Sequence, residues 1–174
     1  MEGHVLLSTP RPEVRRLVPR RRRRESVWMA RSELLRRRSQ APVELIDLTE
    51  EVWSFTRRSG LREGWIGVQV LHTTAALAFN ENEPLLREDL RALLERLAPR
   101  GAGYEHDDFS RRSDLEEEER PNGHSHAKAL LLRASETVHV VGGTPRLGRY
   151  QRLFLVELDG PREREVSLMA LGMR

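Results

Sequence analysis

Apolar and polar residues alternate with two different periods along the chain, and these periods predict its elements. Short runs rich in β-branched and apolar residues predict strands at 32–38, 43–48, 64–71, 75–79, 137–141, 151–158 and 163–171. Leucines at three- and four-residue spacing after Pro84 predict a helix that ends before Pro99. A shorter helix is expected from Thr49 to Gly60, and a short helix or turn over 124–133.

The order of these elements predicts the fold class. Strands that follow one another and are joined by turns favour antiparallel pairing. We therefore expect an α+β fold with packed antiparallel β-sheets and two or three helices on one side. Residues 98–123 have no periodic apolar pattern and predict a long loop, and a loop of this length in a compact domain is commonly functional or mobile.

The first 28 residues carry a different pattern. They contain three prolines and the run Arg20 to Arg24, with no apolar periodicity. We predict a disordered arginine-rich tail at 1–28 and a single domain at 29–174. Met29 is then either the true translation start or the first residue of the folded domain. Too few apolar residues follow the arginines for a signal peptide, so secretion is not expected.

Charge is distributed unevenly between the two parts of the chain. Residues 1–40 carry twelve Arg against four Glu, a net charge of +8, whereas residues 41–174 carry eighteen Arg and Lys against twenty-three acids, a net charge of −5. The basic character therefore belongs to the N-terminal segment. Consecutive arginines without interleaved aromatic residues bind nucleic acid only unspecifically, so nucleic acid is not an expected partner.

Length and composition limit the class of protein. A chain of 174 residues with 38% hydrophobic residues has room for one core, and no apolar run approaches the roughly 18 residues of a spanning helix. A soluble, cytoplasmic protein without membrane contact is expected. The chain has no cysteine, which excludes disulfides, cysteine-based zinc sites and cysteine nucleophiles. Any metal site must use His, Asp and Glu.

The histidines are the main candidates for chemistry. His4 lies in the tail and His139 within a strand, which leaves four at the end of a strand, in the long loop and after it, namely His72, His106, His124 and His126. Side chains at such positions leave the scaffold and can converge. These histidines either build a metal or anion site or are ordinary surface and capping residues.

The local sequence separates His124 from His126. On a helix, residues two positions apart lie about 200° apart, and the helix formers after His126 favour a helix, so one of the two rings is expected to enter a site. Thr73 and Thr74, which follow His72, either donate to an anionic ligand or satisfy the end of a strand. Asp107 and Asp108 either orient an imidazole or bind a hydrated cation, or belong to a solvated loop.

Five segments carry a resemblance to a known family. They are Gly67 to Glu81 (GVQVLHTTAALAFNE), Tyr104 to His106 (YEH), Asn122 to Lys128 (NGHSHAK), Leu147 to Gln151 (LGRYQ) and Asp159 to Arg164 (DGPRER). On these segments the chain is identified as a member of the YjbQ-like family, also called secondary thiamine-phosphate synthases. The resemblance covers roughly residues 43–172.

The resemblance implies a compact α+β fold assembled as a homotrimer, with sites near subunit contacts formed partly by histidines. It implies a divalent metal, Mg or Zn, held by His72, His106 and His126. Catalytic roles carry over to His72, Glu81, His126 and Lys128. Substrate-binding roles carry over to Thr73, Thr74, Asn80, Asn122, Arg149 and Gln151. Where the family often has L-G-T-W-Q, this chain has Arg149 and Tyr150, so a ligand near that aromatic residue can differ.

The activity that the resemblance implies joins a hydroxymethylpyrimidine diphosphate to a thiazole phosphate and releases diphosphate. In the family it is generally a weak, secondary activity. The alternative is a trimeric protein that binds a metal or a small phosphorylated ligand without a physiological transferase role. The sequence does not identify the metal, the physiological substrate or the pathway.

Overall fold

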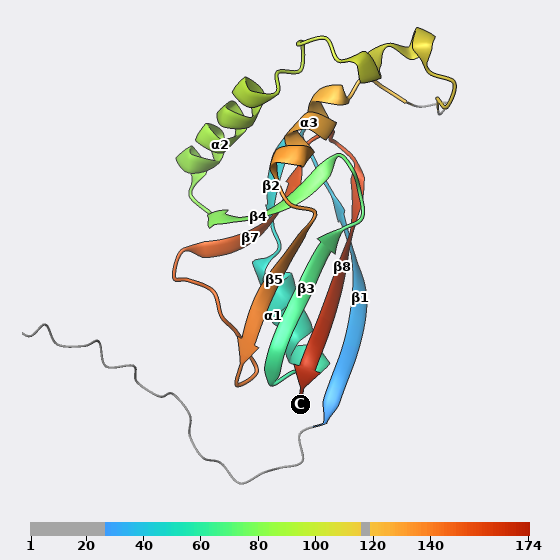
Figure 1. Cartoon of the computed structure of the whole chain (residues 1–174). Helices are drawn as coiled ribbons and strands as arrows, with labels where there is room; N and C mark the ends of the chain where they lie inside the picture. Colours follow the sequence, from blue (N-terminus) through green and yellow to red (C-terminus); the bar gives the residue numbers. More distant parts are fainter. Residues whose placement is uncertain (1–26, 116–118) are drawn as a thin grey trace, which may run out of the picture.

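The computed structural model describes residues 27–115 and 119–174 (Figure 1). Its strands and helices, in chain order, are β1 (Trp28–Arg38), β2 (Glu44–Asp47), α1 (Thr49–Ser59), β3 (Glu63–Val70), β4 (Ala75–Glu81), α2 (Pro84–Leu97), α3 (Gly123–Leu131), β5 (Ser135–Val141), β6 (Thr144–Pro145), β7 (Gln151–Glu157) and β8 (Glu163–Met173). Two short 3-10 turns, η1 (Glu105–Asp107) and η2 (Phe109–Arg111), lie in the long loop. The predicted tail falls mostly on residues 1–26, outside the described residues, and β1 already includes Trp28.

The strands form two sheets in which all pairs are antiparallel, as the sequence predicted. The larger sheet has the order β1-β8-β3-β5-β6 and the smaller one the order β2-β7-β4. Long registers hold the larger sheet together, since β8 pairs with β1 over its full length and with β3 on its other side. The fold class is therefore α+β, and the described residues form packed antiparallel sheets and three α-helices.

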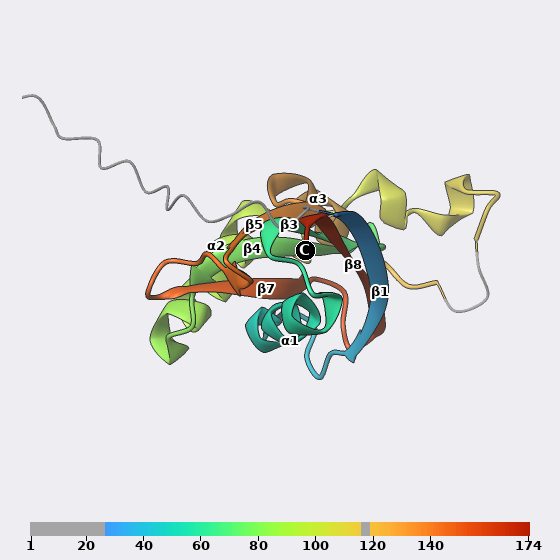
Figure 2. The ribbon, with the colours of Figure 1, turned by 90° about the horizontal axis from the view of Figure 1, so that it is seen from below.

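The helices lie on two sides of the smaller sheet, which corrects the expectation of helices on one side. Apolar residues of α1 share a core with β3, β5, β8 and one face of β7. The other face of the smaller sheet, with Phe154 and Val156, packs against Leu94 of α2 and Ala129 of α3. Figure 2 shows α1 on the concave side of the curved larger sheet. Because apolar residues of β7 point alternately to both faces, the smaller sheet needs a cover on each side.

Local chemistry sets the ends of the two longer helices. Gly60 ends α1 in the left-handed conformation, with a φ of 77°. Pro84 opens α2, and the Glu83 carboxylate accepts hydrogen bonds from the backbone N–H groups of Leu85 and Leu86. No helix among the described residues is long and apolar enough to cross a membrane.

Candidate functional site

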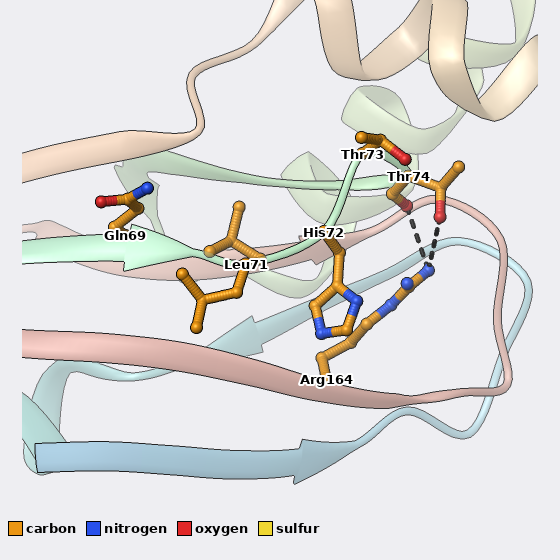
Figure 3. Close-up of a pocket in the computed structure, with 7 residues that line it drawn as sticks. Gln69, Leu71, His72, Thr73, Thr74 and Arg164 are labelled. Carbon is orange, nitrogen blue, oxygen red and sulfur yellow. Dashed lines mark hydrogen bonds between the residues drawn. The ribbon is translucent and has the colours of Figure 1, made fainter.

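A polar cavity lies where β3 ends and β8 begins, beside the start of α3 and the 3-10 turns. Its volume is about 610 Å³. Twelve residues line it, namely His72, Thr73, Thr74, His106, Arg112, Asp114, Glu119, Asn122, His126, Asp159, Arg162 and Arg164. We call this the histidine–arginine cavity. Figure 3 shows His72, Thr73 and Thr74 on the connection that leaves β3, with Arg164 on the neighbouring strand β8.

The base of the cavity is a buried ion pair between the end of β7 and the start of β8. Arg164 donates to Glu157 through Nε at 2.8 Å and through Nη2 at 2.6 Å. Glu157 also accepts hydrogen bonds from the Ser39 hydroxyl and from the backbone N–H of Asp159. Burial alone would raise the pKa of Glu157, but the Arg164 and backbone hydrogen bonds outweigh it and hold that pKa below its ordinary value. The pair is therefore charged, and it fixes the position of Arg164.

The 3-10 turn η1 is attached to the start of α3, and this attachment brings two histidines together. Asp107 Oδ1 accepts the backbone N–H groups of Asn122 at 2.9 Å and Gly123 at 2.8 Å. A Cβ added to Gly123 would lie 2.4 Å from Tyr104 Cβ, so only glycine permits this close approach. The rings of His106 and His126 consequently lie with their centroids 4.7 Å apart, in an edge-to-face arrangement.

The helical geometry of α3 separates His124 from His126, as the sequence predicted. His126 lines the cavity. His124 is 3% exposed and lies outside the cavity, with its Nε2 3.1 Å from the Ser125 hydroxyl and its ring near Tyr104. His139, on β5, also lies outside the cavity.

A second group of polar residues forms the wall near α3. Asn122 donates from Nδ2 to Asp159 Oδ2 at 3.2 Å, and Asp159 Oδ2 also accepts from Arg162 Nε at 2.8 Å. Asn122 Oδ1 is buried and makes no hydrogen bond within the described part of the chain. Because a carboxylate only accepts, Asp159 fixes the orientation of the amide. Asn122 Oδ1 is thus a hydrogen-bond acceptor that has no partner among the described residues.

No arginine that lines the cavity is without a carboxylate within the described residues, and Asp114 adds a further negative charge beside Arg112. Arg112, Arg162 and Arg164 are each paired with a carboxylate, respectively Glu119, Asp159 and Glu157. Burial, together with the charge of Arg164, lowers the pKa of His72. Burial and the neighbouring His106 lower the pKa of His126. Both rings are therefore neutral near pH 7.

These residues do not fit a three-histidine metal site. Within residues 27–115 and 119–174, no group of three or more His, Asp or Glu is arranged to hold a metal ion. His72 already uses Nε2 to accept the backbone N–H of Glu165 at 2.8 Å. Asp107 and Asp108 cap backbone N–H groups of α3 and η2. The donors of the cavity suit an anion better than a cation.

The structure divides the predicted site residues among three places. Six of them line the histidine–arginine cavity, namely His72, Thr73, Thr74, His106, Asn122 and His126. Four others, Asn80, Glu81, Arg149 and Gln151, lie at the far end of the β4–β7 pair, where Glu81 stands opposite Gln151. Since Ala75 directly follows Thr74, this end lies six residues, or roughly 20 Å of strand, from the cavity.

Lys128 is in the third place. Its side chain is 1% exposed, and Nζ donates to Glu95 Oε2 of α2 at 2.7 Å. This hydrogen bond lowers the pKa of Glu95. Within one chain, Lys128 therefore connects α3 to α2 and does not reach the cavity.

Several lining residues were missed as site residues from the sequence, namely Arg112, Asp114, Glu119, Asp159, Arg162 and Arg164. Three of them belong to the segment Asp159 to Arg164, which carried the family resemblance but in which no site residue was predicted. A sequence feature that could have indicated them is the presence of two arginines and an aspartate beside a turn, at the start of a strand with a buried face. Burial of Arg164 depends on Glu157, which the sequence does not place next to it.

The neutral histidines lead to a prediction about stability and pH. The folded pKa values of His72, His124 and His126 lie below the ordinary value of 6.5. The unfolded chain then binds protons first as the pH falls, so the free energy of unfolding decreases below about pH 6.5, by at most about 1.4 kcal/mol per pH unit for each ring. Urea unfolding at pH 7.5, 6.5 and 5.5 measures this decrease. A urea midpoint that stays constant or rises on acidification would contradict it.

The two antiparallel sheets, with a polar cavity where β3 and β8 meet, define an α+β protein of a type already seen in solved structures. A YbjQ-like protein of unknown function from Sulfolobus solfataricus is similar, with a TM-score of 0.76 and 29% identity over 84% of this chain and 99% of that one. A YjbQ/UPF0047 protein from Clostridium acetobutylicum has a TM-score of 0.70 at 27% identity, over 80% of this chain and 99% of that one.

Sequence comparison agrees with the structural comparison. The model of the UPF0047 protein YjbQ-like family matches residues 33–173. A UPF0047 protein of Methanothermobacter thermautotrophicus is 38% identical over 78% of this chain and 87% of its own length. One from Archaeoglobus fulgidus is 40% identical over 74% of this chain and 92% of its own length. The chain belongs to the YjbQ-like (UPF0047) family.

Proposed function

We propose that this protein binds a phosphorylated small molecule in the histidine–arginine cavity and is a transferase of the thiamine-phosphate synthase type. In this reaction a nitrogen lone pair of a thiazole phosphate forms a C–N bond to the methylene of a hydroxymethylpyrimidine diphosphate. The C–O bond to the diphosphate breaks, and the diphosphate leaves with the electron pair. The activity is expected to be weak, as in the family it resembles.

The observation that carries this proposal is the set of donors around the cavity. Guanidinium groups of Arg112, Arg162 and Arg164, imidazole rings and threonine hydroxyls converge on one space of about 610 Å³. Such donors stabilise negative charge on a phosphate oxygen, and they do so best where the charge develops during bond breaking. The reaction needs no protein nucleophile, which agrees with the absence of cysteine from the chain.

Different residues of the cavity would bind the ligand and stabilise the charge of the leaving diphosphate. Arg112 and Arg162 lie on the wall and offer N–H groups beyond those used by Glu119 and Asp159. His126, neutral beside His106, would donate to the leaving diphosphate. Asn122 Oδ1 would accept an N–H or O–H group of the ligand, since it has no partner within the described residues.

The homotrimer belongs to the same proposal. Large apolar side chains stay exposed on strands of the larger sheet, among them Leu34, Trp65 and Met169. Contacts between copies would cover such residues. The far cluster with Asn80, Glu81, Arg149 and Gln151 is too distant to join the cavity of its own chain, and in a trimer it would complete the cavity of a neighbour. A divalent metal would then enter with the diphosphate, whose oxygens Mg²⁺ prefers.

Turnover of the two thiamine precursors by the full chain tests the proposal. We expect His126→Ala to lower the rate of thiamine phosphate formation by about 10²-fold, because it removes a donor to the leaving group. The matched control is His139→Ala, which removes an imidazole from β5 outside the cavity and should leave the rate unchanged. If the unaltered protein turns over no faster than His126→Ala, the transferase proposal fails.

The alternative, a phosphate-binding protein without physiological transferase role, has one observation in its favour. The arginines of the cavity are all paired with carboxylates, and Asp114 is a further acid in the lining, so the described residues offer hydrogen bonds but no net positive charge for a developing diphosphate. In that case the same protein binds inorganic phosphate or diphosphate but forms no product. Metal binding by three imidazoles has less support, because no group of three or more His, Asp or Glu within the described residues is arranged to hold a metal ion.

A further inference from the structure

The hydrogen bond of His72 determines which of its ring nitrogens carries a proton. Nε2 lies 2.8 Å from the backbone nitrogen of Glu165, which can only donate. Nε2 is therefore the acceptor and carries no proton. A ring with an unprotonated nitrogen is not an imidazolium, so His72 is neutral in this arrangement. The single ring proton is then on Nδ1, so His72 has an N–H donor at Nδ1.

Arg164 also offers a hydrogen-bond donor, its Nη1. Its Nε and Nη2 donate to Glu157, and Nη2 also lies 3.0 Å from the Thr74 hydroxyl. Nη1 makes no hydrogen bond with any described residue, although the residue as a whole is only 3% exposed. The buried pair with Glu157 thus fixes a guanidinium whose third nitrogen has no hydrogen-bond partner among the described residues.

Thr74 adds a third donor. Its hydroxyl oxygen accepts from Arg164 Nη2, so the hydroxyl hydrogen is available for another acceptor. His72, Thr74 and Arg164 line both the histidine–arginine cavity and the smaller hollow beside it, of about 450 Å³. Figure 3 shows the His72 ring and the Arg164 side chain in this hollow, with the guanidinium turned to Thr74.

We infer that His72 Nδ1–H, Arg164 Nη1 and the Thr74 hydroxyl form a binding pocket for one oxyanion group, such as the phosphate of a phosphate monoester. His72 serves it as a neutral hydrogen-bond donor and not as a metal ligand or a general base. Three donors without an acceptor favour an anion, and a guanidinium at the same place repels a cation. This inference rests on the proposed function for the class of its ligand.

The protonation of His72 is measurable without any ligand. Long-range ¹H–¹⁵N spectra of the full chain labelled with ¹⁵N-histidine distinguish a protonated from an unprotonated ring nitrogen, and the His72 signals are those lost in His72→Gln. We expect a proton on Nδ1 and none on Nε2 at pH 7.5. Addition of inorganic phosphate should shift the Nδ1 signals, and Zn²⁺ should leave them in place.

Two substitutions at the same position separate the donor from the acceptor. In His72→Gln the amide can still accept the Glu165 N–H but has no group at the place of Nδ1. In His72→Asn a side-chain N–H stays near that place while the Glu165 contact is lost. We expect His72→Gln to raise the Kd for inorganic phosphate about tenfold or more and His72→Asn to raise it less. The control His139→Gln should not change it.

The outcomes distinguish this inference from the proposed function. A proton on Nε2, displacement of the Nδ1 proton by Zn²⁺, or phosphate binding by His72→Gln as tight as in the unaltered protein overturns the oxyanion pocket. Absence of phosphate binding in the unaltered protein overturns it as well. Phosphate binding that depends on His72, without formation of thiamine phosphate, upholds the pocket and overturns the transferase. Thermal unfolding of each variant confirms that the chain is folded.

Discussion

Replacement of Glu157 by glutamine is expected to lower the free energy of unfolding by about 3–5 kcal/mol, because it leaves a buried guanidinium without its counter-charge. Glu157 is fully buried and accepts two hydrogen bonds from Arg164. It also accepts the Ser39 hydroxyl and the backbone N–H groups of Leu158 and Asp159. Glutamine can accept only part of this set. Urea unfolding followed by circular dichroism measures the loss.

Two further variants show whether the charge pair is the cause. Glu163→Gln changes an exposed glutamate of β8 and should shift the free energy of unfolding by less than about 0.5 kcal/mol. The double replacement Glu157→Leu with Arg164→Met removes both charges and should be more stable than Glu157→Gln alone. A loss below about 1 kcal/mol in Glu157→Gln would show that the pair contributes little. The double variant should also bind phosphate weakly, because it lacks Arg164.

Gly64→Ala is expected to have an effect of similar size on the larger sheet, about 3–5 kcal/mol. Gly64 has a φ of 150°, which residues other than glycine rarely adopt, and it stands opposite Gly172 in the β3–β8 pair. A Cβ at Gly64 would lie 2.2 Å from the carbonyl oxygen of Leu171 and 2.8 Å from Gly172 Cα. The two strands must separate to admit the methyl group. Thermal unfolding and the yield of folded protein measure the cost.

Gly67→Ala provides the matched control in the same strand. Gly67 also pairs with β8, but the nearest atom to an added Cβ is the carbonyl oxygen of Met169 at 3.9 Å. This substitution should be neutral or should stabilise the protein by up to about 1 kcal/mol, since alanine restricts the unfolded chain more than glycine does. If Gly64→Ala and Gly67→Ala lowered the stability equally, the close contact between Gly64 and β8 would not be the reason that this position requires glycine.

The strands and helices were predictable because they depend on local patterns. A run rich in β-branched and apolar residues predicted a strand at 64–71, and the structure has β3 at Glu63–Val70. Pro84 and the leucine spacing after it predicted a helix that ends before Pro99, and the structure has α2 at Pro84–Leu97. The placement of helices on two sides was not predictable. It depends on Phe154 and Leu155, neighbours in β7 that are both fully buried but on opposite faces, in two separate cores.

The candidate site was predictable in its histidines and not in its arginines. The end of a strand, the long loop and the start of a helix indicated where His72, His106 and His126 would leave the scaffold, and all three line one cavity. Within a single chain, Lys128 contacts Glu95 and does not reach this cavity. Glu81 lies at the far end of β4, away from the cavity. Local sequence does not determine such distances, because they depend on which strands pair.

The sequence by itself determined the class of fold through the order of its elements, and the separation of His124 from His126 through the period of a helix. Five short segments carried the resemblance to the YjbQ-like family. Only the tertiary structure decided that Arg164 lies buried against Glu157 and that His72 accepts the N–H of Glu165. Both contacts join strands through the antiparallel register of β8 and the turn after β7. The free energy of burying a charge or setting a ring proton depends on such partners from elsewhere in the chain, and a periodic pattern contains no information about them.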